Sequence, residues 1–497
     1  MKTGKSFIVG SAAAMMLAAG GAQAADLPIK AKPVEYVKVC SLYGAGFYYI
    51  PGTDTCLKIG GYLRAETAFA SNAIFQNATN GAAGANNRLS NYYTSRARAD
   101  LNVDTRTATE YGVVRTFFEG VFQWTTGGVT GSSPTTYTGD AIGGGTLGVF
   151  YAFIQFAGFT MGKAVSQFDA PWTNYPGNNF DGLTGGGGTV TGVNQLTYTA
   201  DFGQGITAAV SLQDPTLYTQ SNLWNASTQT AAGVVTGAYG ASDFGGTRSP
   251  DIVGMVRIDQ AWGLFQASLA AHDNHAAYFG ATEITGHPAD KWGFAGQLAL
   301  SIKNIPTGPG DTLNVQGVYT NGASRYNFQS LAPINYAMYG GSNLAGAFQS
   351  LGFAGVSDAV FANGTQQQLT TTYGFRGAFT HNWNPFWNTA VYGSWSAVRY
   401  NATAKGLICN GAGFVELGIA GANCNPDFNI STLGVITRWT PVKNLTFSAD
   451  LAWTRLDQKF AGTATAPAVA AIAKPAAVYQ LRDQDSVSLL MRAQRNF

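Results

Sequence analysis

Charged residues are scarce in this sequence. Only 11% of its 497 residues are Asp, Glu, Lys or Arg, whereas a typical globular chain has about 25%. Aromatic residues, in contrast, reach 13%, and there are 63 glycines. A water-soluble protein with so few charges would be difficult to keep in solution, whereas a β-barrel with one face in lipid has no such need.

The charges that are present have no excess of one sign. There are 29 basic and 27 acidic residues, and two of the basic ones, Lys2 and Lys5, lie in a predicted leader. A near-neutral protein has no electrostatic support for binding nucleic acid or another polyanion. We therefore expect no nucleic-acid partner.

The four cysteines occur without a CxxC motif and without a Cys/His pair at metal-binding spacing. In an exported chain the economical interpretation is two local disulfides, Cys40–Cys56 and Cys409–Cys424, while two other pairings remain open. Each bond would stabilise the fold by about 3 kcal/mol for loops of this size. His272 and His275 form an HxxH pattern in a predicted exterior loop, and we expect them to be solvated, since no third ligand accompanies them. The sequence predicts no metal site and no cofactor.

The N-terminus has the composition of a secretory signal peptide. Lys2 and Lys5 precede an apolar run from Phe7 to Ala19, and Ala22-Gln23-Ala24 supplies a small-x-small cleavage site. The run is too short for a membrane anchor. We predict that residues 1–24 are removed on export and that the mature chain begins at Ala25.

The C-terminal segment alternates strictly between apolar and polar residues. Phe497 ends the chain on the apolar parity, with Val487, Leu489, Met491 and Ala493, whereas Ser486, Ser488, Arg492, Gln494 and Asn496 occupy the other parity. Such a strand has one face for lipid and one for water. A terminal strand with an aromatic carboxy end is what an outer-membrane β-barrel needs in order to close on its first strand.

Alternating segments of about ten residues recur along the chain between turns rich in Gly, Asn, Asp and Pro. The run 141–162 lacks charge but contains six glycines, which favours two strands meeting near Gly158 over a membrane-spanning helix. Seven short turns alternate with eight long loops. The short turns are predicted at 105–109, near Gly158, and at 201–205, 260–263, 305–311, 382–387 and 441–443, and the long loops at 70–90, 125–143, 166–192, 215–249, 274–289, 321–368, 402–429 and 458–482.

This pattern predicts an all-β fold, a transmembrane antiparallel barrel of sixteen strands with short periplasmic turns and long exterior loops. The charges test which face of each strand is inside, because an arginine facing lipid at mid-membrane costs about 2–4 kcal/mol. Charged residues share the parity of polar neighbours in strand after strand. The predicted lumen charges are Arg64, Glu66, Arg96, Arg98, Asp100, Arg115, Glu119, Arg257, Arg376, Asp450 and Arg492.

Two segments resemble a known family. Residues 36–61 begin with YVKVC and run through IPGTDTC, and the chain ends with QRNF. Both segments closely resemble the corresponding ends of alphaproteobacterial general porins. The resemblance implies a sixteen-stranded trimeric porin in outer-membrane lipid, passing small hydrophilic solutes and ions and recognised by the barrel-assembly machinery through its C-terminal strand. We expect residues 25–56 to form a periplasmic or lumen segment closed by Cys40–Cys56, and residues 57–497 to form the barrel.

The third long loop, 166–192, is expected to fold into the lumen, as in the porins that the chain resembles. Its charged residues are Asp169 and Asp181. Facing them we expect a basic wall made of Arg64, Arg96, Arg98 and Arg115 from the first three strands. Acids against arginines would produce a transverse field across a constriction, the kind of feature that selects solutes in a pore. In the alternative interpretation these are ordinary lumen charges at various depths and the loop acids are solvated.

A passive diffusion channel is therefore the predicted function. A substrate-specific channel would need an aromatic track or a ladder of one charge sign, and parity places only Tyr62, Tyr92 and Phe117 inward. An outer-membrane enzyme would need a nucleophile beside a histidine, and no such motif accompanies His381, the one histidine near a predicted strand. A secreted β-rich adhesin would stay in buffer instead of partitioning with the outer membrane.

Overall fold

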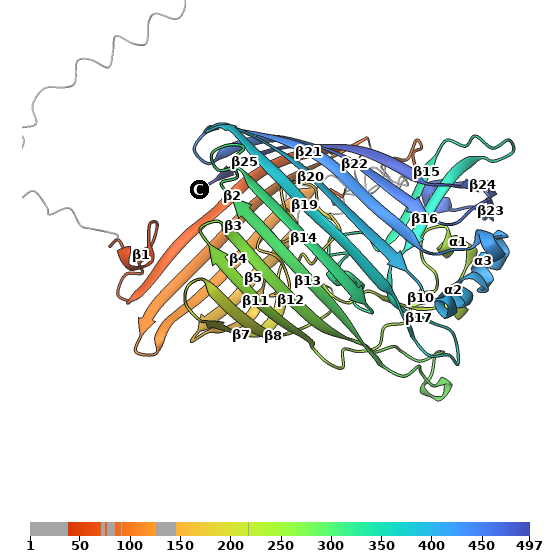
Figure 1. The fold of residues 1–497 in the computed structure, drawn as a ribbon, viewed down its shortest axis with the longest axis horizontal. Helices are drawn as coiled ribbons and strands as arrows, with labels where there is room; N and C mark the ends of the chain where they lie inside the picture. The colour runs from red at the N-terminus through yellow and green to blue at the C-terminus, as the bar shows by residue number, and fades with distance from the viewer. Residues whose placement is uncertain (1–37, 71–74, 77–84, 91, 126–145, 217) are drawn as a thin grey trace, which may run out of the picture.

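Sixteen strands close into one antiparallel barrel in the computed structural model, which describes residues 38–497 except 71–74, 77–84, 91, 126–145 and 217 (Figure 1). The predicted signal peptide and nearly all of the second long loop lie outside the described residues. Each strand pairs with the next along the chain. The barrel strands are β2 (Thr55–Phe69), β3 (Tyr93–Thr109), β4 (Gly112–Thr125), β5 (Thr146–Phe156), β6 (Phe159–Ala164), β7 (Val193–Asp201), β8 (Ile206–Gln213), β11 (Asp251–Gln260), β12 (Gly263–Asn274), β13 (Lys291–Lys303), β14 (Thr312–Asn321), β19 (Thr371–Asn384), β20 (Trp387–Arg399), β21 (Phe428–Val442), β22 (Leu445–Gln458) and β25 (Gln484–Asn496).

The last strand closes the ring on the first, as the alternating C-terminus predicts. β25 pairs antiparallel with β2 from Tyr62↔Asn496 to Phe69↔Leu489. The backbone N–H of Phe497 extends the ladder by donating to the carbonyl oxygen of Gly61 at 3.1 Å. Closure leaves no strand with unpaired backbone groups at an edge of the barrel.

Most predicted turns lie where expected, and one does not. The β5–β6 turn is formed by Ala157 and Gly158, whose φ values are 48° and 85°. Two-residue hairpin turns that match the twist of the strands need a positive φ at both residues. The predicted turn at 105–109 is wrong, because β3 runs through these residues and the turn follows at 110–111. The β-branched Thr107 favours the strand and pairs its hydroxyl with that of Thr55 at 2.9 Å.

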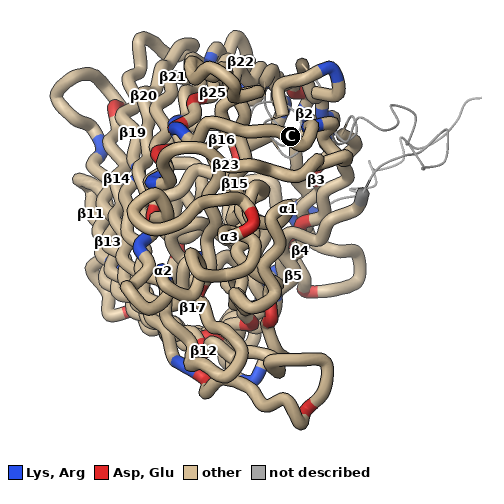
Figure 2. Tube along the Cα trace, turned by 90° about the vertical axis from the view of Figure 1, so that its right-hand side faces the viewer, with Lys and Arg blue, Asp and Glu red and all other residues tan. Residues whose placement is uncertain are grey.

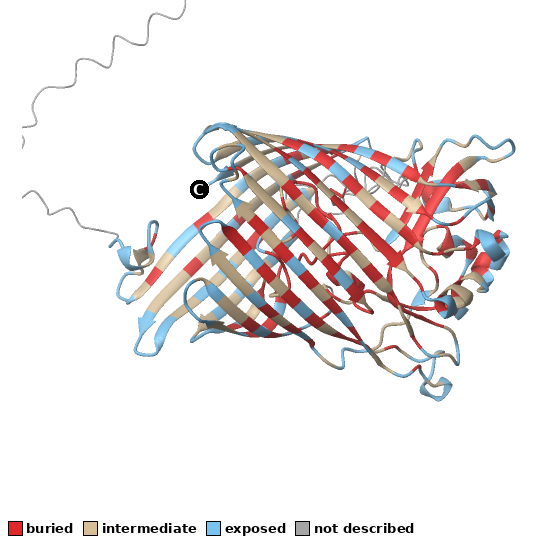
Figure 3. Ribbon diagram, viewed as in Figure 1, coloured by how far each residue is buried: buried red, intermediate tan, exposed pale blue. Residues whose placement is uncertain are grey.

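Burial alternates along the strands, as the banding in Figure 3 shows. In β13, for example, Ala295, Gln297 and Ala299 are buried, whereas Phe294 and Leu298 are exposed on the outer surface. The exposed parity is apolar and the inner parity carries the polar groups. This is the arrangement expected when lipid surrounds the barrel and water or protein fills it.

The long loops fold together at one end of the barrel into a cap with its own core. Seen from that end, α2, α3, β16 and β23 lie across the ring of strands (Figure 2). One cap sheet is β10-β9-β17-β18 and the other is β15-β16-β24-β23. The core includes Tyr239, whose ring centroid lies 4.9 Å from that of Trp224 and 5.4 Å from that of Phe414, and Phe353, which stacks on Phe460 at 4.6 Å.

The cap strands are short, with bounds β9 (Asn222–Asn225), β10 (Ala241–Ser242), β15 (Asn335–Gly340), β16 (Gln349–Gly355), β17 (Ser357–Phe361), β18 (Gln368–Leu369), β23 (Thr463–Ala466) and β24 (Ala477–Leu481). The helices are α1 (Ala231–Val234), α2 (Ala402–Cys409) and α3 (Ala412–Leu417), with 3-10 turns η1 (Ser41–Tyr43), η3 (Ala226–Thr228), η4 (Glu283–Thr285), η5 (Ser324–Tyr326), η6 (Gly421–Asn423) and η7 (Ala470–Ile472). In the part of the chain that the structure describes, no helix is long and apolar enough to cross a membrane.

Both predicted disulfides are present. Cys40–Cys56 joins the segment before β1 (Tyr48–Tyr49) to the start of β2, with which β1 pairs at Tyr48↔Leu57. Cys409–Cys424 joins the end of α2 to the segment that leads into β21, within the cap. The first bond therefore lies at the short-turn end of the barrel and the second at the long-loop end.

The prediction that His272 is solvated in an exterior loop is wrong. β12 continues to Asn274, and the cap covers this end of it, so that His272 is fully buried. Its Nδ1 lies 2.7 Å from Asp251 Oδ1, and its Nε2 lies 3.6 Å from Asp358 Oδ2 in β17. Periodicity did not reveal that a distant loop supplies the second carboxylate.

The inward and outward parities can be tested with one arginine. Leu298, at the middle of β13, is 58% exposed on the outer surface. We expect Leu298→Arg to lower the free energy of unfolding in lipid vesicles by about 2–4 kcal/mol, because the guanidinium would face hydrocarbon. The matched control is Ile302→Arg, near the strand end, which should cost at most about 1 kcal/mol. Equal costs in urea titrations of the two variants would contradict the assigned lipid face.

Candidate functional site: the lumen beside the third loop

The loop between β6 and β7, residues 165–192, lies inside the barrel against the inner faces of β12 to β22. Its first part is held by glutamines. Gln297 Nε2 donates to the carbonyl oxygen of Phe168 at 2.8 Å, and Gln266 Nε2 donates to that of Asp169 at 2.8 Å. The neutral side-chain amides of these glutamines thus bind the loop backbone. From the sequence pattern, they could be recognised only as polar residues on the inner face.

Arg376 of β19 fixes the middle of this loop. Its side chain is fully buried, and its guanidinium donates to the carbonyl oxygens of Leu183, at 2.9 Å, and of Thr173 and Gly187. A buried guanidinium is costly unless its donors are satisfied. These three carbonyls, from both arms of the loop, accept from its two Nη groups, whereas Nε has no acceptor among the described residues. Arg376 therefore has inward parity, as predicted, but it binds the loop instead of facing open space.

A second group of residues fixes the tip of the loop. Asp450 Oδ2 accepts the backbone N–H of Asn179 at 2.6 Å, and Asp450 Oδ1 accepts the hydroxyl of Tyr392 at 2.7 Å. Arg438 Nη2 donates to the carbonyl oxygen of Gly177 at 2.5 Å. The sequence analysis missed Arg438, although its inward position on β21 follows the same parity rule as the other arginines.

The glycine run 185–188 lets the loop backbone lie directly on the wall. A Cβ at Gly186 would overlap the side-chain amides of Gln316 and Gln297, and a Cβ at Gly185, where φ is +98°, would overlap the backbone of Phe375. A side chain at either position would push the loop away from β14 and β19. The glycine run therefore allows the loop backbone to lie in close contact with the barrel wall.

A cavity of about 530 Å³ remains on the other side of the loop, between the loop and the wall formed by β25, β2, β3, β4 and β5. We call it the passage. Polar and charged groups of both signs line it. On the wall these are Tyr62, Arg64, Arg96, Arg98, Glu119, Gln123, Tyr151, Arg492 and Gln494, and on the loop they are Tyr175, Asn178, Asn179, Asp181 and Thr191.

Three of the four arginines expected on a basic wall line the passage, and the fourth does not. Arg115 hydrogen-bonds Asp104 at 3.0 Å and Gln155 at 2.9 Å, nearer the short-turn end. Parity correctly identified its inner face. Parity carries no information about depth, so it could not separate Arg115 from Arg64, Arg96 and Arg98.

The two loop acids do not act together. Asp181 faces the passage, where its Oδ2 lies 3.4 Å from Arg96 Nη1 and Tyr175 donates its hydroxyl to it. Asp169 is buried on the far side of the loop and accepts hydrogen bonds from the backbone N–H and, at 2.8 Å, the hydroxyl of Thr189. Burial raises the pKa of Asp169 to about 6, although these hydrogen bonds oppose the rise. Burial, together with the charge of Asp181, also raises the pKa of Tyr175.

The remaining lumen charges form pairs or larger groups. Glu66 bridges Arg96 and Arg492, with Arg492 Nε 2.5 Å from Glu66 Oε2. Asp100 Oδ1 accepts a hydrogen bond from Asn102 Nδ2 at 3.4 Å. Toward the short-turn end, Arg257 Nε lies 2.6 Å from Asp259 Oδ2.

The three aromatic residues expected in the lumen do not form a track. Tyr62 lines the passage, while Phe117 stacks on Phe153 at 5.4 Å beside Arg115. Tyr92 lies before β3 and is 83% exposed. Its placement in the lumen was wrong because the strand begins one residue later.

The anchoring of the loop predicts a local effect of one substitution. Arg376→Met keeps the length of the side chain but removes the three hydrogen bonds that Arg376 donates to loop carbonyls. We expect backbone amides in residues 166–192 to exchange hydrogen for deuterium at least about tenfold faster, which corresponds to about 1.4 kcal/mol, the order of one hydrogen bond from a charged donor. Arg257→Met, which removes a lumen arginine that hydrogen-bonds Asp259 and no described residue of the loop, is the control. Unchanged exchange in Arg376→Met would show that the glutamines and Asp450 suffice.

Comparisons with known proteins agree with this architecture. A family model described as the porin subfamily matches residues 26–490. Porin Omp2b of Brucella suis biovar 1 (strain 1330) is 36% identical over 214 residues, which are 42% of this chain and 53% of that protein. Omp2b of Brucella melitensis biotype 1 has the same identity and coverage. The chain thus aligns with about half the length of these curated relatives.

Among solved structures, the outer membrane channel DcaP of Acinetobacter baumannii superposes with a TM-score of 0.57. The superposition covers 90% of this chain and 99% of that one, at 13% sequence identity, and it shows similarity of fold alone. The family match, in contrast, spans most of the sequence, including the strands that enclose the passage. The protein is an outer-membrane β-barrel and belongs to the porin subfamily.

Proposed function

We propose that the protein is a passive channel through which small hydrophilic solutes and ions diffuse across the outer membrane. The observation that carries this proposal is the passage, a cavity of about 530 Å³ inside a closed barrel that is lined by charged residues of both signs. Sixteen-stranded barrels are wide enough to hold an aqueous lumen. Here the third loop fills one side of that lumen and leaves the passage along the other, so the loop sets the width.

The charges that line the passage would then act together with its width in selecting solutes. Arg64, Arg96 and Arg98 stand on the wall, and Asp181 stands on the loop. Such a separation of charge orients polar solutes and disfavours apolar ones, which would have to displace ordered water. Asp169 has no part in this field, because it is buried behind the loop.

The proposal includes an orientation and a route to the membrane. The short turns would face the periplasm, together with the segment closed by Cys40–Cys56, and the cap would face the exterior. Residues 1–24 would direct export and be removed. The exposed aromatic Phe497 at the end of β25 would then be recognised by the barrel-assembly machinery.

Single-channel recording tests the function. The purified mature protein in planar bilayers should give large, ohmic current steps in KCl, because charged side chains of both signs line the passage. Heat-modifiable mobility on gels would show beforehand that the barrel is folded. Silent bilayers from heat-modifiable protein would overturn the diffusion channel.

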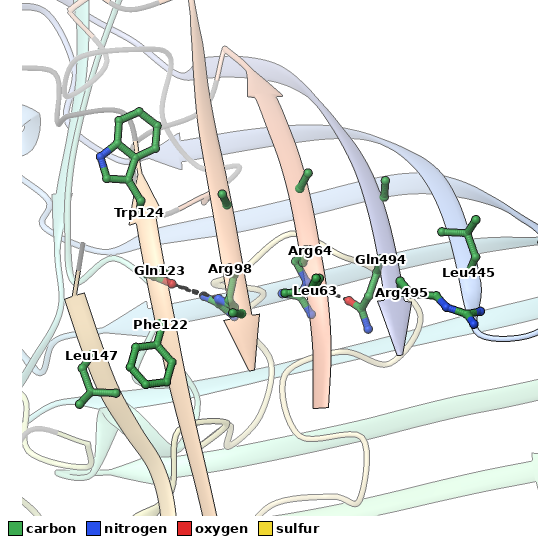
Figure 4. A pocket seen from close by; sticks show the side chains of 14 residues that line it. Leu63, Arg64, Arg98, Phe122, Gln123, Trp124, Leu147, Leu445, Gln494 and Arg495 are labelled. Atoms are coloured by element: carbon green, nitrogen blue, oxygen red, sulfur yellow. Dashed lines mark hydrogen bonds between the residues drawn. The ribbon is translucent and has the colours of Figure 1, made fainter. Parts of the chain in front are cut away.

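The outer surface supports self-association, and we propose a homotrimer. A depression of about 790 Å³ crosses β25, β2, β3 and β4 (Figure 4). Four outward alanines form part of its lining, and larger side chains surround them. The alanines are Ala65, Ala97, Ala99 and Ala493, and the surrounding side chains are Leu63, Phe122, Trp124, Leu147, Leu445 and Arg495. Small residues within a membrane allow another protein surface to approach closely, and the occupant proposed here is a neighbouring copy of the chain.

Filling the depression should therefore dissociate the assembly. Ala65→Trp combined with Ala97→Trp places two indoles where the neighbouring copy would lie. We expect a shift from trimer to monomer in native mass spectrometry from mild detergent, with the barrel still folded. Val256→Trp is the control, because Val256 is 50% exposed on β11, across the ring of strands. A trimer that survives the double substitution would place the interface elsewhere.

A further inference from the structure

One row of side chains crosses the wall of the passage without a carboxylate. The strand register places Gln494 of β25 opposite Arg64 of β2, Arg64 opposite Arg98 of β3, and Arg98 opposite Gln123 of β4. Arg64 Nε donates to Gln494 Oε1 at 2.8 Å, and Arg98 donates to Gln123 Oε1 from Nε at 3.0 Å and from Nη2 at 2.6 Å. Figure 4 shows both amides beside their arginines. Each guanidinium is thus held in place by a neutral group.

Other arginines of the same wall have acidic partners. Glu66 bridges Arg96 and Arg492 in the adjacent row, where Arg96 also contacts Asp181 of the loop, and Asp104 receives Arg106 and Arg115 nearer the short-turn end. No carboxylate of the described residues comes within 4.0 Å of Arg64 or Arg98. The next acids along β3 and β4, Asp100 and Glu119, lie at other register positions, opposite Val121 and Asn102.

Two like charges directly opposite each other on paired strands destabilise a sheet. A carboxylate in place of Gln494 or Gln123 would relieve the repulsion between Arg64 and Arg98, as Glu66 does between Arg96 and Arg492 one row away. Instead, both Nη groups of Arg64 and the Nη1 group of Arg98 are left without a hydrogen-bond acceptor among the described residues. Guanidinium forks of this kind match the oxygens of carboxylate and phosphate groups.

We propose that Arg64 and Arg98 form a binding site for small oxyanions, carboxylates or phosphates, on the permeation path. The ring of Tyr62, 4.6 Å from Arg64 Cζ, and that of Phe150, 5.6 Å from Arg98 Cζ, flank the pair and limit its movement. Gln123 and Gln494 are positioning residues, since they orient the guanidinium groups without neutralising them. The inference rests on the proposed channel and names a solute class that it favours.

Current block by inorganic phosphate and by succinate, at constant ionic strength in KCl, tests the site. Both anions should reduce the wild-type current with saturation, and the reversal potential in a KCl gradient should show anion preference. Gln123→Glu and Gln494→Glu keep both arginines and the side-chain volume but give each guanidinium a carboxylate. We expect each to raise the half-blocking concentration at least about tenfold, and Arg64→Gln/Arg98→Gln to abolish block.

Gln155→Glu is the matched control. Gln155 accepts from Arg115, which Asp104 already neutralises, so the same substitution adds a lumen charge away from the row. If Gln155→Glu raised the half-blocking concentration by the same factor, the effect would come from the overall charge of the lumen, and the specific site would be overturned. Saturable block by neither anion in a conducting wild type would overturn the site while leaving the channel intact. If the folded wild type does not conduct, calorimetric titration with the same anions decides the site separately from the channel, and absence of binding there would overturn it.

Discussion

Everything in this structure depends on the requirement that backbone polar groups within lipid find partners inside the protein. A ring of antiparallel strands meets it only when closed, and the ladder between β2 and β25, extended by the hydrogen bond from Phe497 to Gly61, closes it. Closure with a side-chain period of two then forces apolar residues outward and polar residues inward. The scarcity of charge follows, because one of the two faces can hold almost none.

The inward residues have different partners on the two sides of the barrel interior. On β12 to β22 they satisfy the backbone of the third loop, through Gln266, Gln297, Arg376 and Asp450. A carbonyl that accepts from a fixed guanidinium keeps the loop on that wall. Along β25 to β5 the described residues leave a cavity, and the charged groups there face it. Anchoring on one wall and an open passage along the other are consequences of the same packing.

Period-two patterning predicted the barrel and its strand number, since both depend on local alternation and on the cost of charge in lipid. It could not predict depth or partners. Arg115 shares parity with Arg98 but lies beside Asp104, and Asp169 shares a loop with Asp181 but is buried behind it. His272 meets Asp358 only because a loop more than eighty residues later folds over β12. The core of the cap had no periodic signal at all.

Parity also leaves open which inward arginines hold structure and which face solute, and their acceptors separate them. Arg376 and Arg438 donate to backbone carbonyls of the loop, so removing them would expose unsatisfied groups in a packed region. Arg96 and Arg492 are matched by Glu66 together with Asp181 of the loop, which makes that group nearly neutral. Arg64 and Arg98 receive only glutamine oxygens, so their charge is oriented but not cancelled. Selection for barrel stability alone would have placed a carboxylate beside these two arginines as well. Their uncancelled charge is therefore explained by an interaction with the solute.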